Sequence, residues 1–352
     1  MNSRKVFGTL TCLCAILVLA SSSAITLGQD DPAAYRLITG DGEGSASSFA
    51  EMPDAPSGYF GGCDQGCGQG CYQDCCRPWW SATADVLIWD RIGWKTQTIV
   101  PLLYDGEDGE VTAAQRSDLL NSDDFTFGFR AGPRFSLVRH GCRGYDLEFV
   151  YFGIDGWSDT QIVPASETFL DYDLRYDLSS RLYNAEANLR WNPLCRVALL
   201  AGFRWSKLRE ELRAGYIIDS SFEPVGNLET DNNLYGFQIG TDAILLQRGC
   251  FSVNGLLKAG IYGNHAELTS TVLSGERTLL YSTSTNHTAF IGEVGLQGSY
   301  QVTDCLSLKA GYTVLWIDGV ALPTSQLADG PGIDSSNTVI YHGATAGLEY
   351  RF

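Results

Sequence analysis

The sequence contains few basic residues and few histidines. Lys and Arg number 24 against 41 Asp and Glu, which leaves a formal charge of −17 on 352 residues. Nucleic acids select basic surfaces, so this balance argues against DNA or RNA as a partner. Only four histidines are present, and we find no Ser-centred nucleophile motif, Gly-rich phosphate loop or zinc motif. We therefore expect no enzyme activity, no catalytic residue, no cofactor and no bound metal.

The apolar run near the N-terminus is too short to span a membrane as a helix. It reads "LTCLCAILVLA", follows Arg4 and Lys5, and precedes the small residues "SSSA". A basic start, a short apolar core and small residues are typical of a secretory signal peptide. We predict a signal peptide at residues 1–24, and hence export into a compartment where disulfides form.

A cysteine-rich stretch follows within residues 25–77, a segment rich in Gly, Ser, Ala, Asp and Pro that we predict to be a disordered periplasmic linker. Cysteines recur there every four residues without the paired Cys-x-x-Cys spacing of zinc sites. We expect this linker to oxidise, either within itself or in cross-links to other envelope proteins or to a second copy. The candidates for disulfides or cross-links are Cys63, Cys67, Cys71, Cys75, Cys76, Cys142, Cys195, Cys250 and Cys305.

The last four of these cysteines mark an internal repeat, because they are spaced by 53, 55 and 55 residues. An alternating apolar and polar run lies on each side of every one, which predicts two long strands joined by a tight turn. Together with a first strand and a last strand, the repeat predicts ten strands at about 79–91, 125–138, 143–157, 180–192, 195–208, 233–247, 250–266, 287–302, 305–318 and 339–352.

The connections between these strands alternate between short and long. The long connections are 92–124, 158–179, 210–233, 267–287 and 319–337, and they hold 22 acidic and five basic residues. Long strands, an even strand number and unequal connections are typical of outer-membrane barrels. We predict that residues 78–352 form an all-β, antiparallel transmembrane β-barrel of about ten strands in the outer membrane, with an acidic rim at one end.

Alternation alone also fits a soluble β-sandwich, so the content of the apolar face matters. In the second strand this face carries Phe125, Phe127 and Phe129, and aromatic residues gather near strand ends, as amphipathic rings do at membrane interfaces. Because an open sheet edge is costly in lipid, the first strand must pair with the last. We expect Phe352 to be the last lipid-facing residue.

The opposite face of the strands carries charges of both signs, seven of each. These residues are predicted to face the lumen: Asp85, Arg130, Arg134, Asp146, Glu148, Glu186, Arg190, Arg204, Asp242, Lys258, Glu293, Lys309, Glu349 and Arg351. Inward charges in a narrow barrel must be paired or hydrated. The balance favours a cross-linked interior, and hence a small or gated pore or a structural envelope protein. The alternatives are a closed barrel that anchors the envelope through its cysteine-rich arm and, less favoured, an enzyme with a site at the loop rim.

Two stretches resemble a known group of proteins. "GCGQGCYQDCCRPWWSATADVLIWDR" and "DDFTFGFRAGPRFSLVRHGCRGYDLEFVYFGIDGW" resemble planctomycete outer-membrane β-barrel proteins, a group similar to the pore-forming major outer membrane protein family described from Legionella. The terminal "GLEYRF" looks like the signal read by the barrel-assembly machinery. The resemblance implies an outer-membrane barrel whose partners are membrane lipid and that machinery, and it implies no catalytic residues.

Overall fold

The computed structural model describes residues 79–93, 96–100, 103–105, 111–113, 119–141, 145–167, 171–194, 196–274, 277–327 and 332–352. The chain divides into two units, Met1–Ser57 and Gly58–Phe352, and every described residue belongs to the second. The predicted signal peptide (1–24) and linker (25–77) lie outside the described residues, so both stay predictions.

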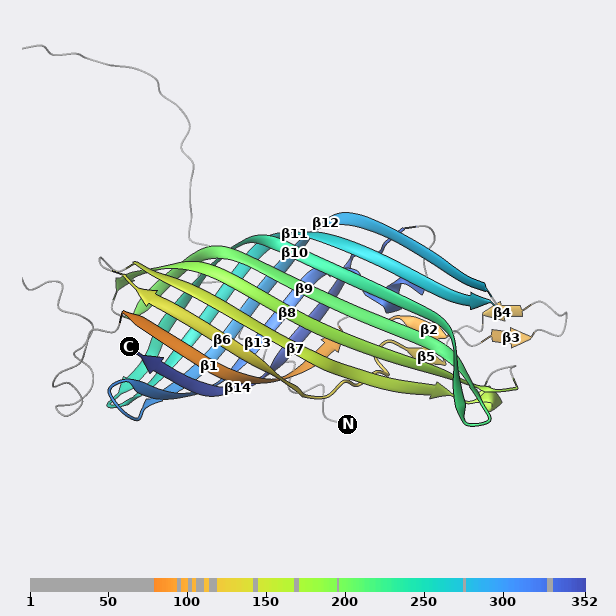
Figure 1. Ribbon diagram of the computed structural model, residues 1–352, viewed down its shortest axis with the longest axis horizontal. Coiled ribbons are helices and arrows are strands. Elements are labelled where there is room, and N and C mark those ends of the chain that lie inside the picture. Colours follow the sequence, from red (N-terminus) through yellow and green to blue (C-terminus); the bar gives the residue numbers. More distant parts are fainter. Residues whose placement is uncertain are drawn as a thin grey trace, which may run out of the picture. The chain divides into compact units, whose positions relative to one another are not determined.

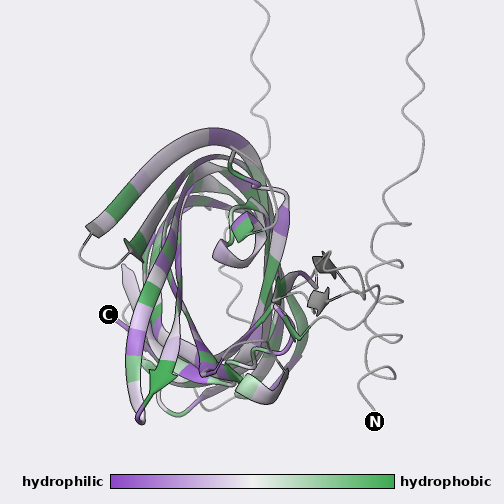
Figure 2. Cartoon of the chain, turned by 90° about the vertical axis from the view of Figure 1, so that its right-hand side faces the viewer, coloured by the Kyte–Doolittle hydropathy of each residue, from purple (hydrophilic) through white to green (hydrophobic). Residues whose placement is uncertain are grey.

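Ten antiparallel strands close into a ring, which confirms the predicted all-β barrel (Figures 1 and 2). Each strand pairs with the next, and β1 pairs with β14 on one side and with β6 on the other. The backbone N–H groups of Trp79 and Trp80 both donate to the Phe352 carbonyl, so the first strand closes on the last as predicted. The barrel strands are β1 (Trp80–Gly93), β6 (Arg130–His140), β7 (Tyr145–Val163), β8 (Asp173–Leu194), β9 (Val197–Ile218), β10 (Ser221–Arg248), β11 (Phe251–Ser274), β12 (Arg277–Gln301), β13 (Leu306–Val320) and β14 (Asn337–Arg351).

Shorter elements lie in the connections. Between β1 and β6, β2 (Thr98–Val100) pairs with β5 (Leu120–Asn121), and β3 (Leu103–Asp105) pairs with β4 (Val111–Ala113). Single turns of 3₁₀-helix, η2 (Ala165–Glu167) and η3 (Pro323–Leu327), follow β7 and β13. Over the described ranges, no helix is both long and apolar enough to cross a bilayer.

Three of the five predicted long connections, 158–179, 210–233 and 267–287, consist largely of strand, so that part of the prediction was wrong. Strands β7 and β8, β9 and β10, and β11 and β12 extend well beyond their predicted ends. Strands β9 and β10 meet at Asp219 and Ser220, whose φ angles of 50° and 66° are those of a tight hairpin turn. Acidic residues such as Glu211 and Glu229 were taken for loop residues, whereas they lie on the water-facing side of these strands, and Glu210 points into the interior.

The start of the second barrel strand also differs from the prediction. Strand β6 begins at Arg130, and the backbone at Gly128 adopts a φ of 63° that redirects the chain just before it. As a result Phe125 and Phe127 are only 6% and 3% exposed inside the barrel, whereas Phe129 is 54% exposed on its outside. Phe125 and Phe127 were predicted to face lipid, and that prediction was wrong.

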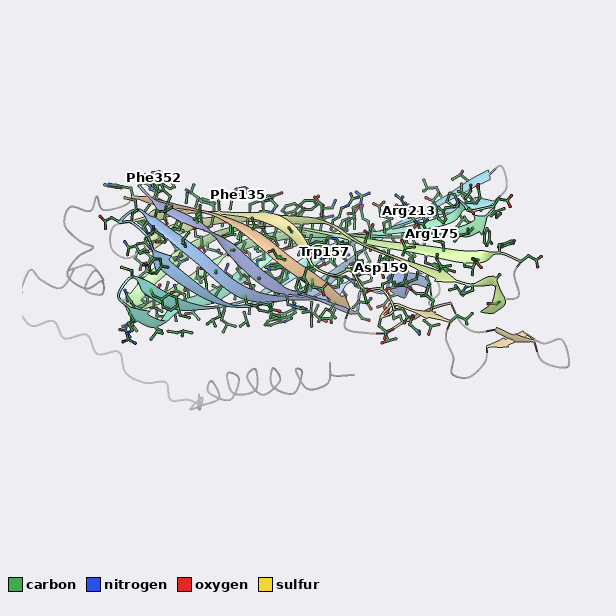
Figure 3. All side chains as sticks on the ribbon, turned by 90° about the horizontal axis from the view of Figure 1, so that it is seen from below. Phe135, Trp157, Asp159, Arg175, Arg213 and Phe352 are labelled. Carbon is green, nitrogen blue, oxygen red and sulfur yellow. The ribbon has the colours of Figure 1, made fainter. Side chains whose placement is uncertain are left out.

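The apolar side of the long strands changes from the outside to the inside along their length. In β9, Leu199 and Phe203 point outward and Arg204 points inward, but further along Leu208 is fully buried inside and Arg213 is exposed outside. Figure 3 shows the two regions, with Phe135 and Phe352 toward one end and Arg175 and Arg213 toward the other. We call the first region the membrane section and the second the outer section.

The outward apolar side chains of the membrane section form a belt: Val86, Ile88, Phe135, Leu137, Phe149, Tyr151, Leu189, Leu199, Phe203, Phe237, Ile239, Leu257, Ile261, Leu296, Leu308 and Leu348. Aromatic pairs flank this belt, with Tyr350 on Phe352 at one margin and Phe290 on Trp316 at the other. An apolar belt between two aromatic girdles is the surface that a barrel presents to a bilayer. The outer section, with water-facing charges and an apolar interior, then projects beyond the bilayer.

Candidate functional site: the interior of the barrel

All fourteen charged residues predicted for the lumen occupy positions on the inward side of their strands. Neighbouring positions along the same strands carry the belt residues, because successive side chains of a strand point to opposite faces. The membrane section therefore encloses a polar interior built from every barrel strand.

Four of these residues form a buried group that we call the central cluster: Glu186, Arg204, Lys258 and Glu293. Arg204 Nη2 lies 2.6 Å from Glu186 Oε1 and also pairs with Glu293, while Lys258 Nζ lies 2.8 Å from Glu186 Oε2. Each of the four side chains is 3% exposed or less. The Gln238 amide donates a further hydrogen bond of 2.7 Å to Glu186. Two cations and two anions thus neutralise one another in the middle of the lumen.

Further ion pairs lie nearer the end of the barrel that carries the short connections, here called the turn end. Arg190 bridges Glu148 at 2.8 Å and Asp242 at 2.9 Å. Glu349 accepts from both Lys309 and Arg351, each at 2.7 Å. These pairs join residues on the same strand, on adjacent strands, or, for Arg190 with Asp242, on strands separated by β9.

The remaining predicted lumen residues are less tightly held. Asp146 lies 3.4 Å from His140, and Arg130 donates to the Gly156 carbonyl at 2.8 Å. Asp85 and Arg134 are register partners on β1 and β6, yet buried Asp85 Oδ1 and Arg134 Nε have no hydrogen-bond partner among the described residues. Both line a cavity of about 90 Å³, together with side chains of the ion pairs just described. A space of this size and polarity can hold a few water molecules.

Beyond the central cluster the interior becomes apolar. Leu87, Trp89, Phe152, Ile154 and Trp157 are buried there in one hydrophobic core. Trp157 lies between the two regions in Figure 3. An apolar core excludes water and ions. The lumen is therefore obstructed at two levels, first by the central cluster and then by this core.

The connection after β13 folds into this core and acts as a plug, which we define as residues 320–327. Asn232 accepts from the Ala321 N–H and donates to the Ala321 carbonyl, both at 2.8 Å. Asn337 donates to Ser325 Oγ at 2.9 Å. Ala321, Leu322, Thr324 and Ser325 are all buried. The side-chain amide of Asn232 thus satisfies both backbone groups of Ala321, as the backbone of a neighbouring strand would.

Sequence reasoning missed one ion pair of the interior, between Arg91 and Glu210. Arg91 donates to both carboxylate oxygens of Glu210 at 3.0 Å, and Ser180 donates to the same carboxylate at 2.9 Å. The predicted strands ended at residues 91 and 208, which placed Glu210 in a loop. The continued alternation of Leu208, Glu210 and Leu212 was the available signal.

Two of the nine candidate cross-linking cysteines are described. Cys250 and Cys305 lie in the short connections after β10 and β12, at the turn end. The other seven lie outside the described residues: Cys63, Cys67, Cys71, Cys75, Cys76, Cys142 and Cys195. Cross-linking therefore stays a prediction, as does the role of Phe352 as an assembly signal. The Phe352 ring is 53% exposed and stacks on Tyr350.

At the opposite end, the charged side chains form local pairs rather than a reactive group. His265 contacts Asn286 at 2.9 Å and Glu267 at 3.2 Å, and hydrogen bonds with these two side chains raise the pKa of its imidazole. Asp123 accepts from Thr96. Within the described ranges, no group of three or more His, Cys, Asp or Glu residues could hold a metal ion.

Residues 151–339 match the model of a family described as "Putative beta barrel porin-7 (BBP7)". The chain belongs to the BBP7 family. It is therefore an outer-membrane β-barrel with a porin-like fold, which confirms the predicted localisation. The narrower relation to planctomycete and Legionella-type proteins stays a prediction. Among curated proteins, none matches the chain.

This BBP7 protein is also distantly similar to solved outer-membrane structures. The outer membrane protease OmpT from Escherichia coli shares 10% identity, with 78% of this chain and 96% of OmpT covered at a TM-score of 0.48. The translocator domain of autotransporter NalP from Neisseria meningitidis shares 10% identity, with 79% and 90% covered at 0.40. The P. putida toluene transporter TodX shares 10% identity, with 78% and 89% covered at 0.28. At these TM-scores we draw no functional conclusion from the likeness.

Proposed function

We propose that this BBP7 protein is a structural outer-membrane barrel that is closed to ions in its resting state. The observation that carries the proposal is the double obstruction of the lumen. The central cluster lies across the lumen of the membrane section, and the apolar core with its plug lies beyond it. An ion that crossed would have to separate buried ion pairs and then enter an apolar core, and both steps are costly.

A closed barrel of this kind can serve a structural role, because it anchors the outer section rigidly to the membrane. Ion pairs between non-adjacent strands, Arg204 of β9 with Glu293 of β12 and Lys258 of β11 with Glu186 of β8, tie the wall together. We extend the proposal to the periplasmic side, where the cysteine-rich linker (25–77) would connect the barrel to other envelope proteins. No reaction is assigned to it, and we propose that it is not an enzyme.

The test is single-channel recording of the refolded mature chain in planar bilayers. We expect no steps in wild type. A variant that loosens the plug, Asn232→Ala, should also stay silent, because the central cluster still blocks the membrane section. Stable conductance of wild type at low voltage would refute a closed resting state.

The second candidate is a gated pore, and the polar cavity of about 90 Å³ favours it. The unpartnered Asp85 and Arg134 atoms give that cavity the character of a hydrated vestibule. If the barrel is gated, Arg204→Ala combined with Asn232→Ala should produce openings that neither single variant shows. Silence of the double variant would exclude this route.

A further inference from the structure

The outer section contains a sheet with two side edges. Strands β7 to β12 all continue beyond the apolar belt, whereas β13 pairs with β12 only as far as Phe290 opposite Asp318. These six strands therefore form a wall in the outer section, bordered by β7 on one side and by β12 on the other. In Figure 1 β12 runs along the border of this wall.

The β7 edge is covered by the chain itself. The connection before β6 runs beside it, where the Thr126 N–H donates to Asp159 at 2.8 Å and Gln161 donates to the Asp124 carbonyl at 3.0 Å. Through these side chains of β7 the connection is held at the edge, where it obstructs the addition of another strand.

The β12 edge has no such cover in the described part of the chain. The Gln301 N–H donates to the Cys250 carbonyl, and the pairing of β11 with β12 runs from there to Arg277 without a register shift. Because antiparallel strands direct alternate residues to alternate sides, the odd-numbered residues of β12 bond to β11. The even-numbered residues direct their N–H and C=O groups to the open side: Thr278, Leu280, Ser282, Ser284 and Asn286.

The sequence of this edge lacks the features that usually prevent strand addition. Residues 277–289 contain no proline and only one charged residue, Arg277. Three large apolar side chains near its tip, Leu279, Leu280 and Tyr281, are 60%, 70% and 54% exposed. Thirteen residues of strand offer a pairing edge about 40 Å long at about 3.3 Å per residue. Long, uncharged and exposed edges are templates for another strand.

We infer that the β12 edge at residues 277–289 is a docking site for an extended segment of a different polypeptide, which adds to the wall as a strand. The unpaired backbone groups define the chemistry of this partner, because only another extended backbone matches their spacing. The inference is independent of whether the lumen conducts.

A second copy of the chain fits this site poorly. Symmetric pairing of two β12 edges requires the strands to run in opposite directions. Two copies inserted in one membrane with the same orientation have their β12 strands running in the same direction. The geometry therefore favours a partner other than a second copy of this barrel in the same membrane.

The test uses the full mature chain, refolded in detergent micelles, and a fluorescent peptide of residues 262–273. This peptide is the segment of β11 that pairs with the other side of the same part of β12, from Tyr262 opposite Ala289 to Leu273 opposite Thr278. We expect saturable binding by fluorescence anisotropy. The variant Ser282→Pro/Ser284→Pro removes two N–H groups from the open side only and should weaken binding by about tenfold or more. The matched variant Ser282→Ala/Ser284→Ala keeps both N–H groups and should bind as wild type does.

A second probe leaves the protein unchanged. Two versions of the peptide, N-methylated at one set of alternate residues or at both sets, keep one free edge or none. The first should bind and the second should not, because a strand pairs through one edge at a time. This comparison decides the question even if the proline variant does not fold. Equal binding of both methylated peptides, no binding of the unmodified peptide, or dimers of the wild-type chain that the proline variant abolishes would each overturn the inference.

Discussion

Removal of the Arg204 guanidinium should destabilise the barrel strongly. Arg204→Met keeps most of the side-chain volume but removes the positive charge. Glu293 then loses its ion-pair partner, and Glu186 keeps Lys258 as its one ion-pair partner within the described residues. The side chains of Arg204 and Glu293 are 1% and 3% exposed, so water cannot replace the lost cation. Breaking a buried pair in this way costs about 3–5 kcal/mol. At an m value of about 3 kcal/mol/M, the urea midpoint should fall by about 1 M or more.

The assay is urea unfolding of the barrel in micelles, followed by tryptophan fluorescence and by the heat-modifiable band on gels. Arg213→Met is the matched control, because its ion pair with Glu211 has the arginine side chain 58% exposed and should contribute less than about 1 kcal/mol. Arg204→Met/Glu293→Gln should recover part of the loss, since it removes the orphaned charge. Equal destabilisation by Arg204→Met and Arg213→Met would show that the central cluster is solvated and that the closed lumen is wrong.

Three further predictions test the division into membrane and outer sections. Ile239→Arg, in the belt, should cost about 2–4 kcal/mol of folding free energy in lipid bilayers, whereas Ser179→Arg, on the outward side of the outer section, should cost little. Similar costs for the two variants would show that the belt does not face lipid. Asn232→Ala should expose the plug and cost about 1–3 kcal/mol, seen as faster hydrogen exchange at residues 320–327. The pKa of His265 should lie above its ordinary value of 6.5, because hydrogen bonds with Asn286 and Glu267 favour the protonated ring, and NMR titration measures this pKa. The resulting stabilisation is present below pH 6.5 and is lost as pH rises through the raised pKa.

The strands themselves could be predicted because their period-2 pattern is local. The fourteen inward charges follow from the same alternation once strand phase is known. For example, Arg204 and Phe203 are neighbours in sequence and must lie on opposite faces. Strand number and closure then follow from the even count and the cost of an open edge in lipid.

The outer section was not predictable by the same means, because the strands continue after their surroundings change. In β9 the residues after Ser206 still alternate, but the apolar ones point inward. A pattern that assumes lipid outside reads these residues as a polar loop. The plug was equally hidden, since the bonds between Asn232 and Ala321 join residues 89 positions apart.

The change of side within single strands also fixes the height of the barrel in the bilayer. A vertical shift by two residues, about 6.7 Å along a strand, would carry Lys207 of β9 into the position of Trp205 and move its charge toward lipid. The opposite shift would lift belt residues such as Phe203 into water. Piston-like movement is therefore resisted in both directions, and any opening of this barrel has to come from rearrangement of the side chains and the plug within a stationary wall.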